Sequence, residues 1–254
     1  MISFNNNDLF QILLNRLRKD RKGSINAEEF ESFLRSRNLD YFNQQFNVDG
    51  VSQINTDSLQ VFAMDNEPIA VTQDGSLRIY LATLPTGATA YAHAISAFYS
   101  TSSSDLSTLV EMDLVSNAEL PNRLNNAITG PSAVYPIGWI TDLVMRVYGV
   151  TTGYVILNYY RYPLDPYFDY YTDAYGNITY LTDGQPAHTL LAGQVSRSGL
   201  TAGHLVTSAS VDLEWGDQDA VNILDMVMSD VSLSQNDQAG MQSSILERQN
   251  NVTS

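Results

Sequence analysis

The feature of this 254-residue sequence that most constrains its fold is a change in hydrophobic period along the chain. Apolar residues recur at three- and four-residue spacing in residues 7–22 and 219–231, as on an amphipathic helix. Between residues 69 and 215 the period shortens toward two, which is typical of strands. The sequence therefore predicts an α+β fold: a central antiparallel β region, as a sandwich or small sheet, with a helical cluster formed by the N- and C-terminal segments.

The second of two N-terminal helices has the clearest start signal. Asn26 stands at the N-cap position, and Glu29, three positions later, completes a capping box. Ile25 and Phe30 flank this turn as a hydrophobic staple. A short third helical piece is expected after Thr56, before the period changes.

Turn-forming residues divide the central region into short candidate strands. Tyr175-Gly176-Asn177 lies between two aromatic-rich runs and predicts a hairpin. The candidate strands are residues 76–81, 91–99, 143–148, 154–162, 177–181 and 204–215.

The C-terminal segment returns to a helical pattern. Residues 219–231 carry an apolar stripe, residues 238–249 predict a second and mostly polar helix, and Asp217 stands where an N-cap would be useful. We therefore expect three segments: an N-terminal helical segment (1–66), a β-rich domain with a tyrosine-rich hairpin (67–216), and a C-terminal helical segment (217–254) that packs on the N-terminal helices.

A run of aromatic residues over 154–180 is the main candidate for function, since it holds nine of the fifteen tyrosines. Tyrosine offers a large apolar area and a hydroxyl group at low rotamer entropy, so clusters of it favour interfaces. Any single ring could equally pack within a sheet. Residues 154–162 are the better candidate for a core strand, and residues 167–180 for a projecting hairpin. The aromatic interface candidates are Tyr159, Tyr160, Tyr162, Tyr167, Phe168, Tyr170, Tyr171 and Tyr175.

Charge is distributed unevenly along the chain, whose formal net charge is −15. Seven of the thirteen basic residues fall within the first 37 positions, and from residue 38 onward six basic residues stand against 23 acidic ones. A body this acidic is repelled by phosphate backbones, which disfavours sequence-specific nucleic-acid binding. The basic cluster could instead meet an acidic protein surface. Its interface candidates are Arg18, Lys19, Arg21 and Lys22.

No pattern for catalysis, metal binding or cofactor binding stands out, so none of these is expected. The chain has no cysteine, its three histidines are far apart, and nucleotide-binding and serine-hydrolase motifs are missing. Pairs such as Asp169 with Asp173 could serve glycoside cleavage, but among 28 acidic residues a capping or solvated role is the better interpretation. Neither a secretory signal nor a membrane span is expected, since no long uncharged apolar run occurs.

Three segments together resemble a family of virion structural proteins from crAss-like phages and related phages of Bacteroidetes. The first contains Lys22-Gly-Ser-Ile25, Glu28-Glu-Phe30 and Tyr41-Phe42-Asn43-Gln44. The second contains Glu119-Leu-Pro-Asn-Arg123, Pro131-Ser-Ala-Val-Tyr-Pro136 and Val155-Ile-Leu-Asn-Tyr-Tyr-Arg-Tyr-Pro163. The third is Ser210-Val-Asp-Leu-Glu-Trp215, where Gly216 follows in place of the family's proline.

This resemblance implies a structural subunit of a head-to-tail connector, an adaptor or neck ring beneath the portal. It further implies a homo-oligomeric ring of twelve copies that contacts the portal protein on one side and a tail or ring protein on the other, in a virion assembled in the host cytoplasm. The alternative from the residues is a carbohydrate-binding β-module, because exposed Tyr and Trp rings stack on sugars; Tyr160 and Tyr171 are its candidates. A glycosidase is the least favoured interpretation.

Overall fold

The computed structural model describes residues 4–19, 25–47, 57–74, 79–104, 107, 109–126, 128 and 130–252, without the side chains of 19, 47 and 235–252. The chain forms two compact units: Leu59–Tyr162 is one, and Met1–Ser58 with Pro163–Ser254 is the other. We call them the β unit and the helical unit. The mixed architecture confirms the predicted α+β class. The units differ from the three expected segments, because residues 163–216 belong with the helices instead of with the central strands.

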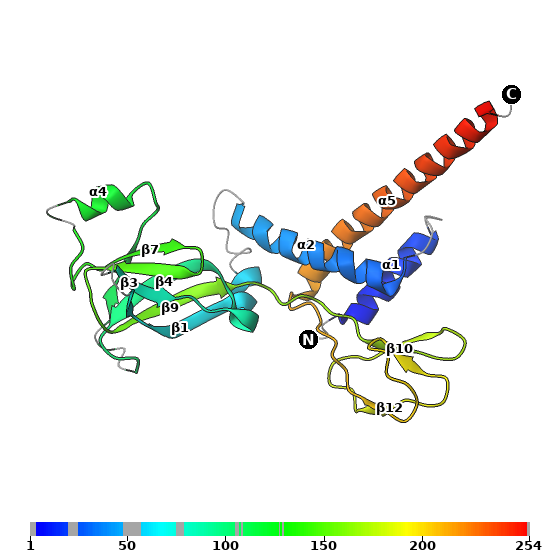
Figure 1. Ribbon diagram of the computed structural model, residues 1–254, viewed down its shortest axis with the longest axis horizontal. Helices are drawn as coiled ribbons and strands as arrows, with labels where there is room; N and C mark the ends of the chain where they lie inside the picture. Colours follow the sequence, from blue (N-terminus) through cyan, green and yellow to red (C-terminus); the bar gives the residue numbers. More distant parts are fainter. Residues whose placement is uncertain are drawn as a thin grey trace. The chain divides into compact units, whose positions relative to one another are not determined.

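The β unit consists of two sheets with the strand orders β1-β9-β4-β5 and β2-β3-β8-β7-β6 (Figure 1). Every pairing is antiparallel except that of β6 with β7. Both sheets contribute to one core, which contains Ala82, Met145, Leu157 and Tyr159. The strands are β1 (Ala63–Ala70), β2 (Thr72–Asp74), β3 (Ile79–Thr83), β4 (Tyr91–Ser100), β5 (Val110–Glu111), β6 (Asp113–Leu114), β7 (Ile137–Thr141), β8 (Val144–Tyr148) and β9 (Tyr154–Arg161).

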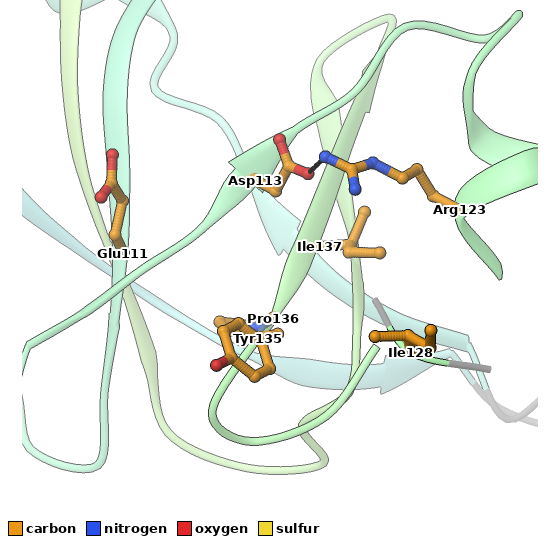
Figure 2. A pocket seen from close by; sticks show the side chains of 7 residues that line it. All are labelled: Glu111, Asp113, Arg123, Ile128, Tyr135, Pro136 and Ile137. Atoms are coloured by element: carbon orange, nitrogen blue, oxygen red, sulfur yellow. Dashed lines mark hydrogen bonds and ion pairs between the residues drawn. The ribbon is translucent and has the colours of Figure 1, made fainter. Parts of the chain in front are cut away.

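Short helical pieces connect these strands. Residues 57–59 and η1 (Gln60–Phe62) form the helical piece that the sequence predicts after Thr56. The others are η2 (Gly87–Thr89) and α4 (Leu120–Leu124). Near α4, a pocket of about 320 Å³ opens between charged and apolar side chains (Figure 2).

Five strands of the β unit, namely β1, β2, β5, β6 and β7, lie outside the candidate strands that the sequence predicts. In β1, polar residues and Pro68 interrupt the apolar alternation, and the register shifts between Met64 and Glu67. At this bulge Asn66 has a positive φ of 57°, and its N–H donates to Asn158 Oδ1 at 2.7 Å. Pairing with β9 therefore decides the conformation of β1, and residues 63–66 are not the end of a helical segment. Strand β7 pairs with β8 in the same antiparallel manner.

The helical unit contains α1 (Asn6–Lys19), α2 (Ala27–Asn47) and α5 (Asp217–Val252), and α5 packs on both other helices. Leu13, Phe30 and Leu224, one from each helix, are fully buried. The short strands form two small sheets, β11-β10-β13 and β12-β14, and Figure 1 shows β10 and β12 on one side of α1 and α2. Their bounds are β10 (Tyr170–Thr172), β11 (Ile178–Tyr180), β12 (His188–Thr189), β13 (Val195–Ser196) and β14 (Leu205–Val206).

The capping box at the start of α2 is confirmed. Asn26 N–H donates to Glu29 Oε2 at 3.2 Å, and Glu29 N–H donates to Asn26 Oδ1 at 2.8 Å. Both staple residues, Ile25 and Phe30, are buried. Helix α1 begins after Asn5, whose Oδ1 accepts the Asp8 N–H at 2.8 Å. Its expected end at residue 22 lies outside the described residues.

Three expectations for residues 204–254 are wrong. One helix, α5, replaces the two expected over 219–231 and 238–249, because the residues between them include neither proline nor glycine to stop it. Asp217 is its first residue instead of its N-cap, and the carboxylate accepts the Phe4 N–H at 3.3 Å. Within residues 204–215, only β14 and an isolated bridge between Val211 and Tyr167 are strand-like.

Candidate functional site

The aromatic run lies partly in each compact unit. Its first part is β9, where Tyr159 is fully buried and its hydroxyl donates to Thr89 O at 2.8 Å. Tyr160, the next residue of β9, is partly buried. Tyr162, at the end of the β unit, is 41% exposed. Tyr159 is therefore a core residue, which matches the interpretation of residues 154–162 as a core strand.

The second part of the run begins with a buried aromatic cluster in the helical unit. Phe168 is 3% exposed and meets Tyr180 edge-on, with their ring centroids 4.4 Å apart. Phe10 of α1 lies 5.8 Å from both rings, and Phe30 of α2 lies 6.1 Å from Phe168. Burial raises the pKa of Tyr180 to about 12. These contacts attach the start of the tyrosine-rich hairpin to the helices.

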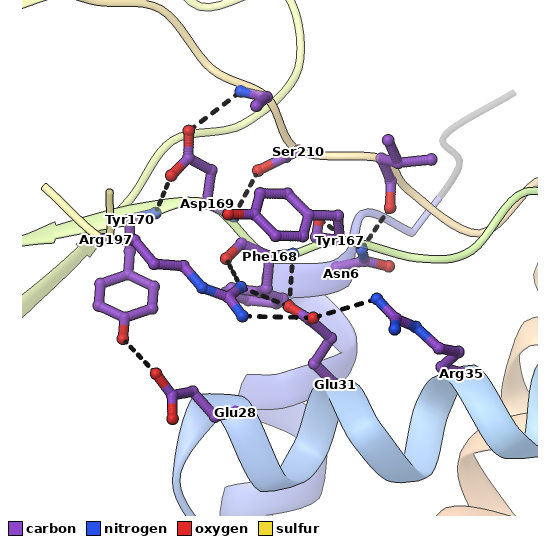
Figure 3. A network of polar contacts seen from close by, with 12 residues as sticks. Asn6, Glu28, Glu31, Arg35, Tyr167, Phe168, Asp169, Tyr170, Arg197 and Ser210 are labelled. Atoms are coloured by element: carbon purple, nitrogen blue, oxygen red, sulfur yellow. Dashed lines mark hydrogen bonds and ion pairs between the residues drawn. The ribbon is translucent and has the colours of Figure 1, made fainter. Parts of the chain in front are cut away.

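Arg197 and Glu31 form a polar network next to this cluster (Figure 3). The two side chains are only 18% and 9% exposed, and they form an ion pair. The Arg197 guanidinium also donates to Phe168 O and lies over the ring of Tyr167, 4.5 Å from its centroid. The hydrogen bond and charge of Glu31 raise the pKa of Arg197. Glu31 in turn accepts the Phe168 N–H at 2.9 Å. Glu31 and Arg197 thus bond the N–H and the C=O of Phe168, and they hold this segment against α2.

Tyr170 contributes to the same network. Its hydroxyl donates to Glu28 Oε1 at 3.3 Å, and its ring centroid lies 5.7 Å from the Arg197 guanidinium. Burial, together with the charge and hydrogen bond of Glu28, raises the pKa of Tyr170. The network thus brings together Tyr167, Phe168 and Tyr170, three of the candidates from the sequence, in contacts within one chain.

The carboxylates of the run support the backbone. Asp169 is 7% exposed and accepts the N–H groups of Tyr170 and Ala209 at 2.9 and 3.1 Å. Asp173 accepts the N–H groups of Tyr175 and Asn177, both at 2.8 Å. Hydrogen bonding, led by the Asn177 side chain, lowers the pKa of Asp173. Asp173 therefore supports the turn of the hairpin, while Asp169 holds its own segment to residue 209.

The predicted hairpin is present, since β10 and β11 pair across residues 173–177. Tyr171 stacks on His188, with ring centroids 4.8 Å apart and planes 11° apart, and packs against Leu181, Leu190 and Val206. Tyr175, at the tip, is 91% exposed. The exposed ring of this hairpin is thus Tyr175, while Tyr170 and Tyr171 are held by contacts within the chain.

The basic candidates are described only in part. Arg18 is exposed on α1. Arg21, Lys22 and the side chain of Lys19 lie outside the described residues. Nearby on α1, Arg16 pairs with Asp225 of α5.

Two sets of exposed apolar side chains contain residues that, apart from Tyr175, the sequence reasoning did not single out. The β10–β14 apolar set, in the helical unit, lies on the short strands and their loops: Tyr175, Ile178, Leu191, Val195, Leu200 and Leu205, between 37% and 91% exposed. The 124–135 apolar set, in the β unit, lies at the end of α4 and in the segment before β7: Leu124, Ile128, Val134 and Tyr135, between 36% and 90% exposed. Both sets could have been predicted from the sequence, because their apolar residues lie in polar stretches rich in turn-forming residues.

Comparison of the sequence with protein-family models and with curated proteins gives no match. Among the residues that the structure describes, no three His, Asp or Glu side chains lie together in a way that could hold a metal ion. Within the same ranges, no helix combines the length and apolar character needed to cross a bilayer.

Proposed function

We propose that this protein is a structural subunit of a bacteriophage head-to-tail connector, a portal-proximal adaptor or neck ring that forms an oligomeric conduit for genome passage. The resemblance in sequence motivates the proposal. The structural observation that carries it is the presence of two different sets of exposed apolar side chains, one in each compact unit.

A ring that closes by rotation requires two different surfaces on every subunit, one for each neighbour. A two-fold dimer requires only one surface, which pairs with itself. In our proposal the β10–β14 apolar set of one subunit contacts the 124–135 apolar set of the next. Tyr175, the most exposed tyrosine of the predicted interface, then lies within this contact. The number of twelve copies comes from the resemblance alone.

The charge of the chain suits such a role. At a net charge of −15, the walls of a conduit would repel the phosphates of passing DNA and limit adhesion. The exposed Arg18 and the neighbouring basic residues of the sequence would face an acidic surface of the portal protein.

Two double variants test the pairing of the sets. Leu191→Ser with Leu205→Ser alters one set, and Val134→Ser with Tyr135→Ser alters the other; all four side chains are at least 63% exposed, so both variants should fold. Native mass spectrometry of the wild type should show a ring. Each variant alone should be monomeric, whereas an equimolar mixture should form dimers and nothing larger, because only one intact contact can form.

The matched control is Val61→Ser with Leu143→Ser, which removes exposed apolar groups outside both sets and should leave the ring intact. A wild type that stays monomeric even with the portal protein, or a mixture that never forms the mixed dimer, would refute the proposed contact.

Carbohydrate binding, the alternative from the sequence, draws less support from the geometry. Tyr171 is stacked on His188, and Trp215 is 3% exposed, so neither ring is available to lie flat on a sugar. Glycan binding by the wild type that Tyr171→Ala abolishes would reverse this preference.

A further inference from the structure

The pocket near α4 has two chemically different sides (Figure 2). The paired Asp113 and Arg123 line one side, Tyr135 with Pro136 and Ile128 lines the opposite one, and Glu111 of β5 lies apart from the pair. Ile137, which is 2% exposed, lies between the two sides. The volume of about 320 Å³ is at the lower end of the range for ligand pockets, roughly 300–1,000 Å³.

The charges of the pocket favour a cation. Arg123 and Asp113 form an ion pair, so these two charges largely cancel. The Glu111 carboxylate forms no ion pair or side-chain hydrogen bond with any residue that the structure describes, so its negative charge remains. Tyr135 is 64% exposed and offers the negative face of its ring, which also attracts cations. The Glu111 carboxylate would repel an anion. A purely apolar ligand would remove water from this carboxylate without replacing its hydrogen bonds.

The apolar side of the pocket, opposite the Asp113–Arg123 pair, favours a ligand whose cation is attached to an aliphatic chain. A lysine or arginine side chain has this construction, since its methylene groups cover apolar surface while its charged end stays with a polar partner. We infer that this pocket binds a lysine or arginine side chain that a partner protein presents. The stem packs on Tyr135, Pro136 and Ile137, and the charged end pairs with Glu111. The pocket shares Ile128 and Tyr135 with the 124–135 apolar set, so it has to be tested on a subunit in which no neighbour covers that set.

A lysine analogue without a partner protein tests the chemistry. The probe is Nα-acetyl-lysine methylamide, and the reference is the norleucine analogue with the same stem and no charge. Saturation-transfer NMR detects weak binding and is run on the full-length Leu191→Ser with Leu205→Ser variant, in which no neighbouring subunit covers the pocket. We expect the lysine probe to bind and the norleucine probe to bind at least about threefold more weakly. Equal binding of the two probes would overturn the inference.

Two variants should change the affinity in opposite directions. Glu111→Gln keeps the shape and removes the free charge, so the lysine probe should bind about three- to fivefold more weakly. Arg123→Gln frees Asp113, so the same probe should bind more tightly. Asp65→Asn, an exposed carboxylate change on β1 of the same unit, should have no effect.

Thermal melting should first show that all three variants fold. An unchanged affinity in Glu111→Gln, or a weaker one in Arg123→Gln, would place the probe elsewhere and refute the assignment. Ring formation is measured independently, so a negative result here leaves the proposed function standing, and a monomeric wild type would leave the pocket open to test.

Discussion

The ion pair between Glu31 and Arg197 should be the most sensitive polar contact of the helical unit. Glu31 accepts the Phe168 N–H at 2.9 Å and pairs with Arg197, whose side chain is 18% exposed. Glu31→Ala therefore leaves the Arg197 guanidinium and the Phe168 N–H without the carboxylate that both contact. Breaking a buried pair from one side costs about 3–5 kcal/mol. Because Arg197 keeps Phe168 O and its place over Tyr167, we expect the lower end, about 3 kcal/mol.

A double-mutant cycle separates the pair from the loss of packing. Arg197→Met keeps the stem of the side chain, and the combination with Glu31→Ala removes both charges. Because the double variant buries no unpaired charge from this pair, its cost should fall below the sum of the single costs by about 1–3 kcal/mol. The matched control is Arg16→Met, whose ion pair with Asp225 is exposed; it should cost less than about 1 kcal/mol.

The positions of the two tryptophans suit the measurement. Trp215 lies in the helical unit and Trp139 in the β unit, so a Trp139→Phe background makes fluorescence report unfolding of the helical unit alone. Urea titrations of the four members of the cycle give the coupling energy. Additive costs, or an Arg197→Met variant no less stable than the Arg16→Met control, would refute the view that this network holds the tyrosine-rich segment on α2.

The remaining predictions concern strain and pH. Gly149 has a φ of 94°, and a Cβ there would lie 2.6 Å from Ser132 N and O, so Gly149→Ala should destabilise the β unit by more than about 2 kcal/mol in urea unfolding followed at Trp139. Gly176→Ala, at a φ of 81° with open space around it, should cost only about 1 kcal/mol; equal costs would contradict the steric argument. Tyr180 has a pKa of about 12, above the ordinary value of 10, so the folded state holds this proton more tightly than the unfolded one. The stability that the protonated Tyr180 contributes should be complete below pH 10 and lost as the pH rises toward 12. In urea unfolding, the midpoint should therefore fall over this pH range, and it should fall less in Tyr180→Phe. A Tyr180→Phe variant with the same pH profile as the wild type would disprove the role of Tyr180.

Local signals determined the elements whose causes are local. The capping box at Asn26 and Glu29 set the start of α2, and the turn around Gly176 set the hairpin, because these contacts span only a few residues. Strand β9 followed from its own run of apolar and aromatic residues. The α+β class followed from the same periodicity.

Tertiary contacts decided what the pattern left open. Strand β1 forms because β9 offers it an edge, despite Pro68 and an Asn66 with positive φ. The tyrosines after Pro163 belong with the helices because Arg197 and Glu31, 166 positions apart, meet there. Composition showed that residues 154–180 are rich in rings, but which rings are exposed depends on partners far away in sequence. Only the folded chain therefore separates the buried Tyr159 from the exposed Tyr175.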